Sequence, residues 1–281
     1  MIGSGRRRQF SIGSLDVALA VSRRLDLPQC ESESEASLEA ARPWRIPELL
    51  DHPDGHLRHR RLSAAIRSDF CGGTLLDVGD RFCQLAAWLP TFSVAATDKL
   101  KAIPERLDAS CFIEADFTQA EQVFPDKSFD IVASTDVLEH VAPGDRRLFL
   151  ENCVRVARQA VYVAFPSGTA ALQAEALIRR SASKNVFAES LSEHAAAGLP
   201  DLSEIKQVLG GLGVSYEIRT LTTIFEWLTS FVFGPDDGDR ELIRDYRTFI
   251  KKMATDEVGS GTPYRYLVIV KLQEGALRWR N

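Results

Sequence analysis

The chain has 281 residues, of which 45% are hydrophobic and 26% charged, and its net charge is −5. Such a composition is typical of one large globular domain with appendages, and the acidic balance argues against nucleic-acid binding by the whole surface. Five widely spaced cysteines include no Cys-x-x-Cys pair, which argues against a disulfide framework or a cysteine zinc site. Because no apolar run reaches the roughly 18 residues of a membrane helix, we expect a cytoplasmic protein without a stable membrane span.

Residues 1–45 are expected to form a mostly disordered or loosely docked tail, because the acidic run Glu31–Glu35 has nothing to bury. Arg7-Arg8-Gln9-Phe10 echoes a twin-arginine export signal, but Asp16 interrupts the apolar region that such a signal needs. Residues 46–281 are expected to form the folded domain, with insertions at about 168–200 and 223–262.

The folded domain begins with a basic helix and continues with alternating strands and helices. His52, His56 and His59 lie in the helical stretch 52–68; we interpret them as structural, because the arginines around them would repel a metal cation. Strands are predicted at 74–79, 93–97, 111–115, 129–134 and 160–165, with helices at 84–89, shortly after 98 and at 145–157. This alternation predicts an α/β, doubly wound, Rossmann-like sheet that is mostly parallel.

The last third of the chain follows a different pattern. Residues 170–181 and 202–209 are predicted helices, and 182–200 is predicted to be irregular. Two further strands, 214–221 and 264–272, are separated by about forty residues, a length that indicates an inserted cap rather than a loop.

Aspartates follow four successive predicted strands: Asp77, Asp98, Asp116 and Asp136. Open parallel sheets bind their ligands at the carboxyl ends of the strands. A carboxylate after the second strand can accept both hydroxyls of a ribose, and one after the third can accept from an adenine amino group. Each aspartate alone could equally be a helix cap or turn residue; the four together predict an adenosine-shaped site.

The motifs around these aspartates resemble the class I S-adenosylmethionine-dependent methyltransferases. The resemblance extends over about 46–165 and rests on Leu76-Asp77-Val78-Gly79, Thr97-Asp98, Ala115-Asp116-Phe117, residues 124–132 and Asp136-Val-Leu-Glu-His-Val141. It implies a seven-stranded sheet with an antiparallel last strand and S-adenosyl-L-methionine as cofactor. It also implies site roles: Asp77 and Gly79 near the methionyl part, Asp98 on the ribose, Asp116 with Phe117 around the adenine, and Asp136 at the sulfonium end.

The chain departs from the family in its glycine-rich turn. The family pattern Asp-x-Gly-x-Gly-x-Gly would place glycine where this chain has Arg81 and Cys83. Arg81 can pair with the cofactor carboxylate through its guanidinium, or Arg81 and Phe82 can fill the pocket. The leading hypothesis is therefore an active methyltransferase, and the alternative is an inactive methyltransferase-like binding or scaffolding protein.

Methyl transfer from a sulfonium requires positioning of the acceptor and, for a hydroxyl, removal of its proton. His140 is the candidate base; the other interpretation is a structural histidine. Asp136-x-x-Glu139-His140 also resembles the acidic-acidic-histidine metal ligation of some superfamily members, but without a second convincing histidine we expect no metal. The pair Glu193-His194 is expected to be solvated.

The expected acceptor is a small molecule or a glycan-type hydroxyl, held between the strand ends and the two insertions. A resemblance of the region 193–200 to methyltransferases linked to surface polysaccharide synthesis is what suggests a glycan.

Overall fold

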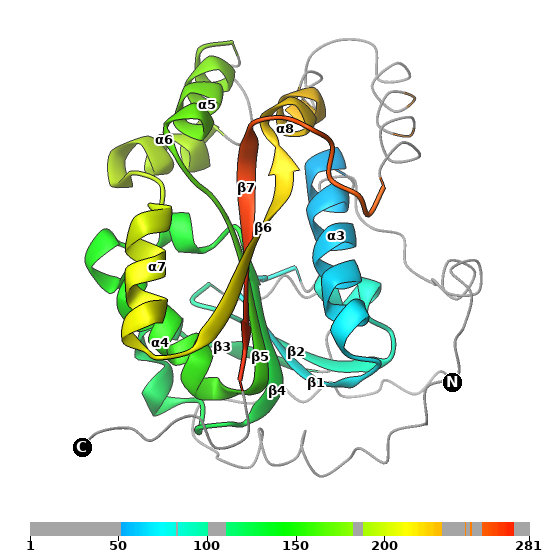
Figure 1. Cartoon of the computed structure of the whole chain (residues 1–281), viewed down its shortest axis with the longest axis vertical. Helices are drawn as coiled ribbons and strands as arrows, with labels where there is room; N and C mark the ends of the chain where they lie inside the picture. The colour runs from blue at the N-terminus through cyan, green and yellow to red at the C-terminus, as the bar shows by residue number, and fades with distance from the viewer. Residues whose placement is uncertain are drawn as a thin grey trace, which may run out of the picture.

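A seven-stranded sheet forms the centre of the computed structural model, which describes residues 52–82, 84–100, 111–181, 188–231, 245, 248 and 255–272. The strand order is β3-β2-β1-β4-β5-β7-β6, and β7 alone runs antiparallel to its neighbours (Figure 1). The predicted Rossmann-like sheet with an antiparallel last strand is thereby confirmed. The strands are β1 (Gly73–Val78), β2 (Phe92–Asp98), β3 (Cys111–Glu114), β4 (Phe129–Thr135), β5 (Ala157–Pro166), β6 (Ser215–Thr223) and β7 (Pro263–Lys271).

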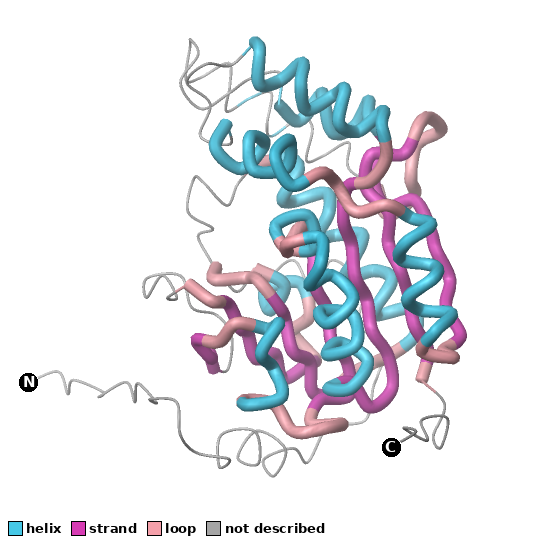
Figure 2. The backbone as a smooth tube through the Cα atoms, turned by 90° about the vertical axis from the view of Figure 1, so that its left-hand side faces the viewer, coloured by secondary structure: helices cyan, strands magenta, loops and turns pink. Residues whose placement is uncertain are grey.

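Helices cover both faces of this sheet because neighbouring strand residues point to opposite sides. Leu75 belongs to one buried cluster and Leu76 to the other. The first cluster packs under α3 (Pro53–Asp69) and the short 3-10 helix η2 (Leu85–Trp88). The second packs under α4 (Arg146–Val156) and α7 (Leu202–Gly211). Figure 1 shows α4 and α7 on one side of the sheet and α3 on the other, and Figure 2 looks onto the side of α4 and α7.

Helix α3 is the basic lead-in helix that the sequence predicts. It begins where the His52 side chain accepts a hydrogen bond from the Asp54 backbone N–H, 3.3 Å away, and Pro53 occupies the first turn. The His56 ring lies edge-on to Trp88, with 4.8 Å between ring centroids. His59 Nδ1 lies 2.7 Å from the Gly55 carbonyl oxygen. All three histidines thus have structural partners.

Three further helices form a cap beside the end of the sheet where β6 ends and β7 begins (Figure 1). They are α5 (Thr169–Ser181), α6 (Ala188–Ala197) and α8 (Ile224–Phe231). Their small apolar core contains Trp227, which stacks on Tyr264 of β7 with 4.2 Å between ring centroids. The cap is therefore anchored to the sheet through the first residues of β7.

Helix α6 corrects two expectations, because residues 182–200 were predicted to be irregular and Glu193-His194 to be solvated. Leu191 is the helix's buried leucine, and His194 is only 5% exposed although Glu193 remains exposed. A polar residue occupies a position that faces the interior, so the apolar periodicity that identifies a helix is missing.

Several predictions lie outside the described residues. These are the tail 1–45, the helix shortly after 98, Cys83 and much of the 223–262 insertion. Among the helices that the structure describes, none combines the length and the apolar character needed to cross a membrane.

Candidate functional site

The turn after β1 requires glycine at position 79 for a packing reason. Gly79 has φ +85°, and a Cβ at this position would lie 2.2 Å from Cγ2 of Val137. Its backbone N–H donates to the Thr97 carbonyl oxygen at 2.7 Å. The turn after β1 is thus pressed against the segment that follows β4 and tied to β2.

Two aspartates, Asp77 and Asp80, support this turn, which has no glycine besides Gly79. The Asp80 carboxylate accepts from the backbone N–H groups of Phe82 at 2.9 Å and Gln84 at 2.5 Å. Asp77 is 1% exposed, and burial together with the neighbouring Asp80 raises its pKa well above the ordinary value. A carboxyl so completely enclosed supports the turn from inside the protein.

Arg81 and Asp98 lie close enough to influence each other at the edge beyond β1 and β2. Burial raises the pKa of Asp98, while the Leu100 N–H and the positive charge of Arg81 oppose that shift. Asp98 Oδ1 accepts from Leu100 N–H at 2.7 Å, and its other oxygen has no partner within the described residues. Arg81 Nε is buried and likewise lacks a hydrogen-bond partner there. Both side chains therefore retain hydrogen-bonding capacity.

The pair predicted around the adenine divides into one exposed and one buried residue. Asp116 is exposed and caps the short helix η4 (Phe117–Gln122), accepting from Thr118 N–H at 2.9 Å. The Phe117 ring packs in the core between Phe124 and Phe149, with centroid distances of 5.7 and 5.5 Å. Because its ring is 5% exposed, Phe117 has little aromatic surface to offer a ligand.

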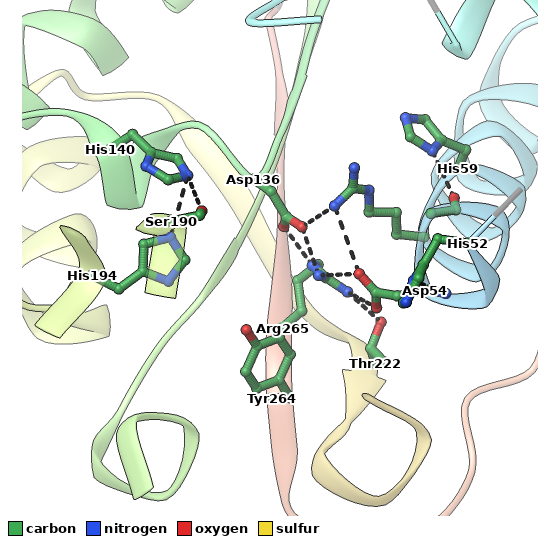
Figure 3. Close-up of polar contacts among 12 residues, drawn as sticks. His52, Asp54, His59, Asp136, His140, Ser190, His194, Thr222, Tyr264 and Arg265 are labelled. Atoms are coloured by element: carbon green, nitrogen blue, oxygen red, sulfur yellow. Dashed lines mark hydrogen bonds and ion pairs between the residues drawn. The ribbon is translucent and has the colours of Figure 1, made fainter. Parts of the chain in front are cut away.

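Asp136 lies in a buried network that we call the arginine–aspartate cluster: Asp54, Arg58, Asp136 and Arg265. The Arg265 guanidinium donates to both Asp136 oxygens, at 2.5 and 2.6 Å, and to both Asp54 oxygens at 3.1 Å (Figure 3). Arg58 adds a third contact to Asp136 at 2.5 Å. Two cations and two anions thus compensate each other across α3, the end of β4 and the start of β7.

This cluster keeps Asp136 ionised. Burial alone raises the pKa of Asp136, but Arg265 and Arg58 outweigh burial and hold it far below its usual range. The backbone of Asp136 has φ +56°, a left-handed conformation that aspartate tolerates better than most residues. With both oxygens paired, Asp136 is equipped to hold charge and geometry rather than to accept a proton.

A second polar cluster lies on the other side of Asp136, where His140 and His194 face each other (Figure 3). We call these two residues the histidine pair. Their Nε2 atoms are 3.2 Å apart. His140 Nδ1 lies 3.0 Å from Glu193 Oε2, and His194 Nδ1 lies 3.1 Å from Glu175 Oε1. Helix α6 thereby brings a second histidine to the residue predicted as the base.

Several residues of these clusters were not predicted from the sequence: Asp54, Arg58, Glu175 and Arg265. Arg265 offered a signal, since a charged residue within an apolar strand needs a buried partner. Because β7 runs antiparallel to β5, Arg265 near its start lies beside the carboxyl end of β5, at the edge of the sheet where the aspartates are. Glu175 lies in α5 and offered no comparable signal.

Comparison with known proteins agrees with this architecture. Residues 75–165 match the family model described as a methyltransferase domain. This match agrees with the resemblance that the motifs around the aspartates indicate. A comparison with curated proteins gives no match.

Solved structures with the same fold include the plantazolicin methyltransferase BpumL with a triazolic desmethylPZN analog and SAH. It is 14% identical, with a TM-score of 0.51 over 91% of this chain and 94% of that chain. A SAM-dependent methyltransferase from Archaeoglobus fulgidus is 18% identical, with a TM-score of 0.49 over 76% and 92%. Magnesium protoporphyrin IX methyltransferase from Synechocystis PCC 6803 is 14% identical, with a TM-score of 0.47 over 82% and 89%. At such identities the likeness concerns the fold alone.

Proposed function

We propose that this protein transfers a methyl group from S-adenosyl-L-methionine to a small-molecule or glycan-type acceptor, with oxygen as the methylated atom. The observation that carries the proposal is the family match over 75–165, within which Asp98 ends β2 with one carboxylate oxygen unpaired among the described residues. An aspartate in this position can accept from ribose hydroxyls.

We assign the other parts of the cofactor to further residues at the strand ends. The turn of Asp77 and Gly79 would lie beside the methionyl part, and Arg81, whose buried Nε has no partner among the described residues, would pair with the carboxylate. Asp116 would accept from the adenine amino group; Phe117 would contribute backbone and shape rather than its ring, which is buried. Asp136, kept ionised by two arginines, would face the positive sulfonium.

The chemistry left to the protein is positioning and proton removal, because the bound sulfonium supplies the methyl group. We propose His140 for the proton, with Asp136 held in a fixed position beside the reacting centre by Arg58 and Arg265. His140 Nδ1 faces Glu193, an arrangement that orients the ring and leaves Nε2 as the acceptor atom. The acceptor would lie between these residues and the cap formed by α5, α6 and α8.

The acceptor is the least constrained part of the proposal. The named neighbours act on chemically different molecules, so their acceptors do not select one here. The acidic net charge of −5 favours a small molecule or glycan over nucleic acid, and a cytoplasmic location is part of the proposal.

The competing proposal is a methyltransferase-like protein that binds or scaffolds without catalysis. Arg81 favours it, because a side chain now stands in a turn where the family usually has glycine, and its guanidinium lies 5.8 Å from the Phe82 ring centroid. If that pair occupied the space of the methionyl group, no cofactor would bind.

Calorimetric titration with S-adenosylmethionine and S-adenosylhomocysteine distinguishes the two proposals. Binding is expected for the wild-type chain, and Asp98→Ala should weaken it by about 1 to 3 kcal/mol through lost ribose hydrogen bonds. Asp126→Ala is the matched control, since this exposed carboxylate pairs with Arg155 and lies outside the proposed cofactor residues. No heat at millimolar ligand would remove the enzyme proposal. If Asp98→Ala bound the cofactor with the affinity of the wild-type chain, the assignment of the ribose to Asp98 would be wrong.

A further inference from the structure

The histidine pair has outer partners that fix both rings. Glu193 stands at Nδ1 of His140 and Glu175 at Nδ1 of His194, at 3.0 and 3.1 Å. A carboxylate accepts hydrogen bonds, so we assign the ring proton of each imidazole to Nδ1. In neutral imidazoles, both Nε2 atoms then present lone pairs.

These lone pairs face each other across 3.2 Å, which is unfavourable unless something positive lies between them. Ser190 Oγ, 3.4 Å from His140 Nε2, can donate to one of the two rings only. The two facing Nε2 atoms would therefore be stabilised by a cation bound between them.

A buried carboxylate completes the cluster. Glu139 is 1% exposed, and its Oε2 has no hydrogen-bond partner among the described residues. One ligand atom from each of Glu139, His140 and His194 can be chosen so that all lie within 4.8 Å of one another. No other group of three potential ligands is found within the described parts of the chain.

From this geometry we propose that Glu139, His140 and His194 form a binding site for one divalent first-row transition-metal ion such as Zn²⁺. Two imidazoles and one carboxylate are a donor set that such ions accept, whereas Mg²⁺ and Ca²⁺ prefer oxygen ligands throughout. Two nitrogens bound to one tetrahedral ion at about 2.0 Å lie about 3.3 Å apart, close to the 3.2 Å between the Nε2 atoms.

The outer residues match the same proposal. Histidines that bind metals usually donate their other ring N–H to a carboxylate, which orients the ring and increases its basicity. Glu193 and Glu175 occupy these positions, and Tyr264 Oη donates to Glu175 Oε1 at 2.9 Å. Three protein ligands leave at least one coordination position open for water or an oxygen of a bound molecule.

The site is separate from the cofactor residues at the ends of β1, β2 and β3. It is also separate from the arginine–aspartate cluster, whose carboxylates are already paired with arginine. Metal binding can therefore be tested without cofactor and without turnover. With the metal bound, His140 Nε2 would hold the ion, so the base proposed above would apply to the metal-free protein.

The test is a titration of the metal-free full chain, carrying no polyhistidine tag, with Zn²⁺ by calorimetry and with Co²⁺ by visible absorption. We expect one ion per chain and a ligand-field spectrum with nitrogen donors. His194→Ala and Glu139→Gln should each abolish specific binding, and Glu175→Gln should weaken it about 10- to 100-fold by removing the outer carboxylate charge. Mg²⁺ and Ca²⁺ should produce no heat.

The control is His56→Ala, which removes a histidine of α3 that lies against Trp88 and should leave one-to-one binding unchanged. Circular dichroism of each variant verifies folding, and His194→Gln replaces His194→Ala if the smaller side chain unfolds the cap. Absence of Zn²⁺ and Co²⁺ binding by the wild-type chain would overturn the proposal. Binding that survives in the His140→Ala/His194→Ala double variant would also overturn it, because the ion would then lie elsewhere.

Failure of this proposal and failure of the proposed methyl transfer give different results. Loss of S-adenosylhomocysteine binding contradicts the cofactor site and leaves the Zn²⁺ titration unaffected. Loss of Zn²⁺ binding leaves the cofactor titration unaffected.

Discussion

Within the arginine–aspartate cluster, Asp136 is the member that faces the histidine pair, and the other members lie on its far side (Figure 3). Both clusters combine elements that are far apart in the sequence. In the arginine–aspartate cluster, two guanidinium groups face two carboxylates, so the buried charges compensate each other. In the cluster around the histidine pair, the outer nitrogens are satisfied, but the inner nitrogens face each other and a Glu139 oxygen is unpaired.

The difference separates a structural network from a site that is prepared for a ligand. Buried polar groups in native proteins nearly always have partners, so an unpaired buried atom requires an explanation. Arg58 Nε is also buried without a partner among the described residues, so what distinguishes the arginine–aspartate cluster is that its charges compensate each other. A charge-compensated network should respond to mutation through stability, and the histidine pair should respond to the ligand that completes it.

The largest expected effect is on the arginine–aspartate cluster. Arg265→Met should lower the free energy of unfolding by about 3 to 5 kcal/mol, because Asp54 and Asp136 would remain buried with fewer compensating charges. Urea denaturation measures the change. The control is Lys271→Met, on the same strand as Arg265. It removes an ion pair between the exposed Lys271 and Asp69 of α3 and should cost less than about 1 kcal/mol. Equal losses of unfolding free energy in Arg265→Met and Lys271→Met would show that the buried cluster contributes no more than a surface ion pair.

The next effect is the pH dependence of folding stability that arises from His59, a buried histidine beside the arginine–aspartate cluster. Burial, followed by the charge of Arg58, lowers the pKa of His59 from 6.5 to about 4. As the pH falls between these values, the unfolded chain binds a proton that the folded chain does not. Folding stability should therefore decrease by up to about 3 kcal/mol over this range.

His59→Gln removes this titration and should flatten the pH dependence by the same amount, whatever its stability at neutral pH. Urea denaturation at pH 7, 5.5 and 4 gives the two profiles. If the stability of the wild-type chain and of His59→Gln changed in parallel with pH, the pKa of His59 would not be lowered in the folded protein.

The histidine pair should respond to metal where the arginine–aspartate cluster does not. Zn²⁺ at 100 times its dissociation constant should raise the free energy of unfolding by about 2.7 kcal/mol, because the ion binds the folded chain. The same addition should not stabilise His194→Ala, and it should stabilise Arg265→Met as it does the wild-type chain. Thermal unfolding with and without Zn²⁺ provides the measurement. Equal stabilisation of His194→Ala would assign the ion to another place.

The smallest effect tests the outer support of the histidine pair. Tyr264→Phe keeps the stacking on Trp227 but removes the hydrogen bond to Glu175, which should cost about 1 kcal/mol. Tyr266→Phe is the control, because that hydroxyl has no hydrogen bond within the described residues. Indistinguishable urea denaturation curves for the two variants would show that the hydroxyl of Tyr264 contributes nothing to this support.

The sheet could be predicted because its signals are local. Apolar runs such as 74–79 and 129–134 are bounded by turn residues, and the order of strands and helices restricts the topology. The aspartate positions are equally local: Asp98 ends β2, Asp116 follows β3 and Asp136 follows β4. The roles of these aspartates toward a cofactor stay predictions.

Helix α6 and its histidine show where local signals fail. Apolar periodicity assumes that the buried face is apolar, but His194 occupies that face because Glu175 and His140 provide polar partners there. These partners come from α5 and from the segment after β4, 19 and 54 residues away. No window along the sequence contains all three residues.

For this protein, the sequence by itself determined the sheet and the positions of the aspartates at its edge, because hydrophobic period, turn residues and motif spacing act over short distances. The tertiary structure decided which charges meet. It paired Asp136 with Arg265, 129 residues later, and set His194 against His140. The physical reason is that burial makes each polar group depend on its partner, and only the packing of α3, α5, α6 and β7 around the sheet brings those partners together.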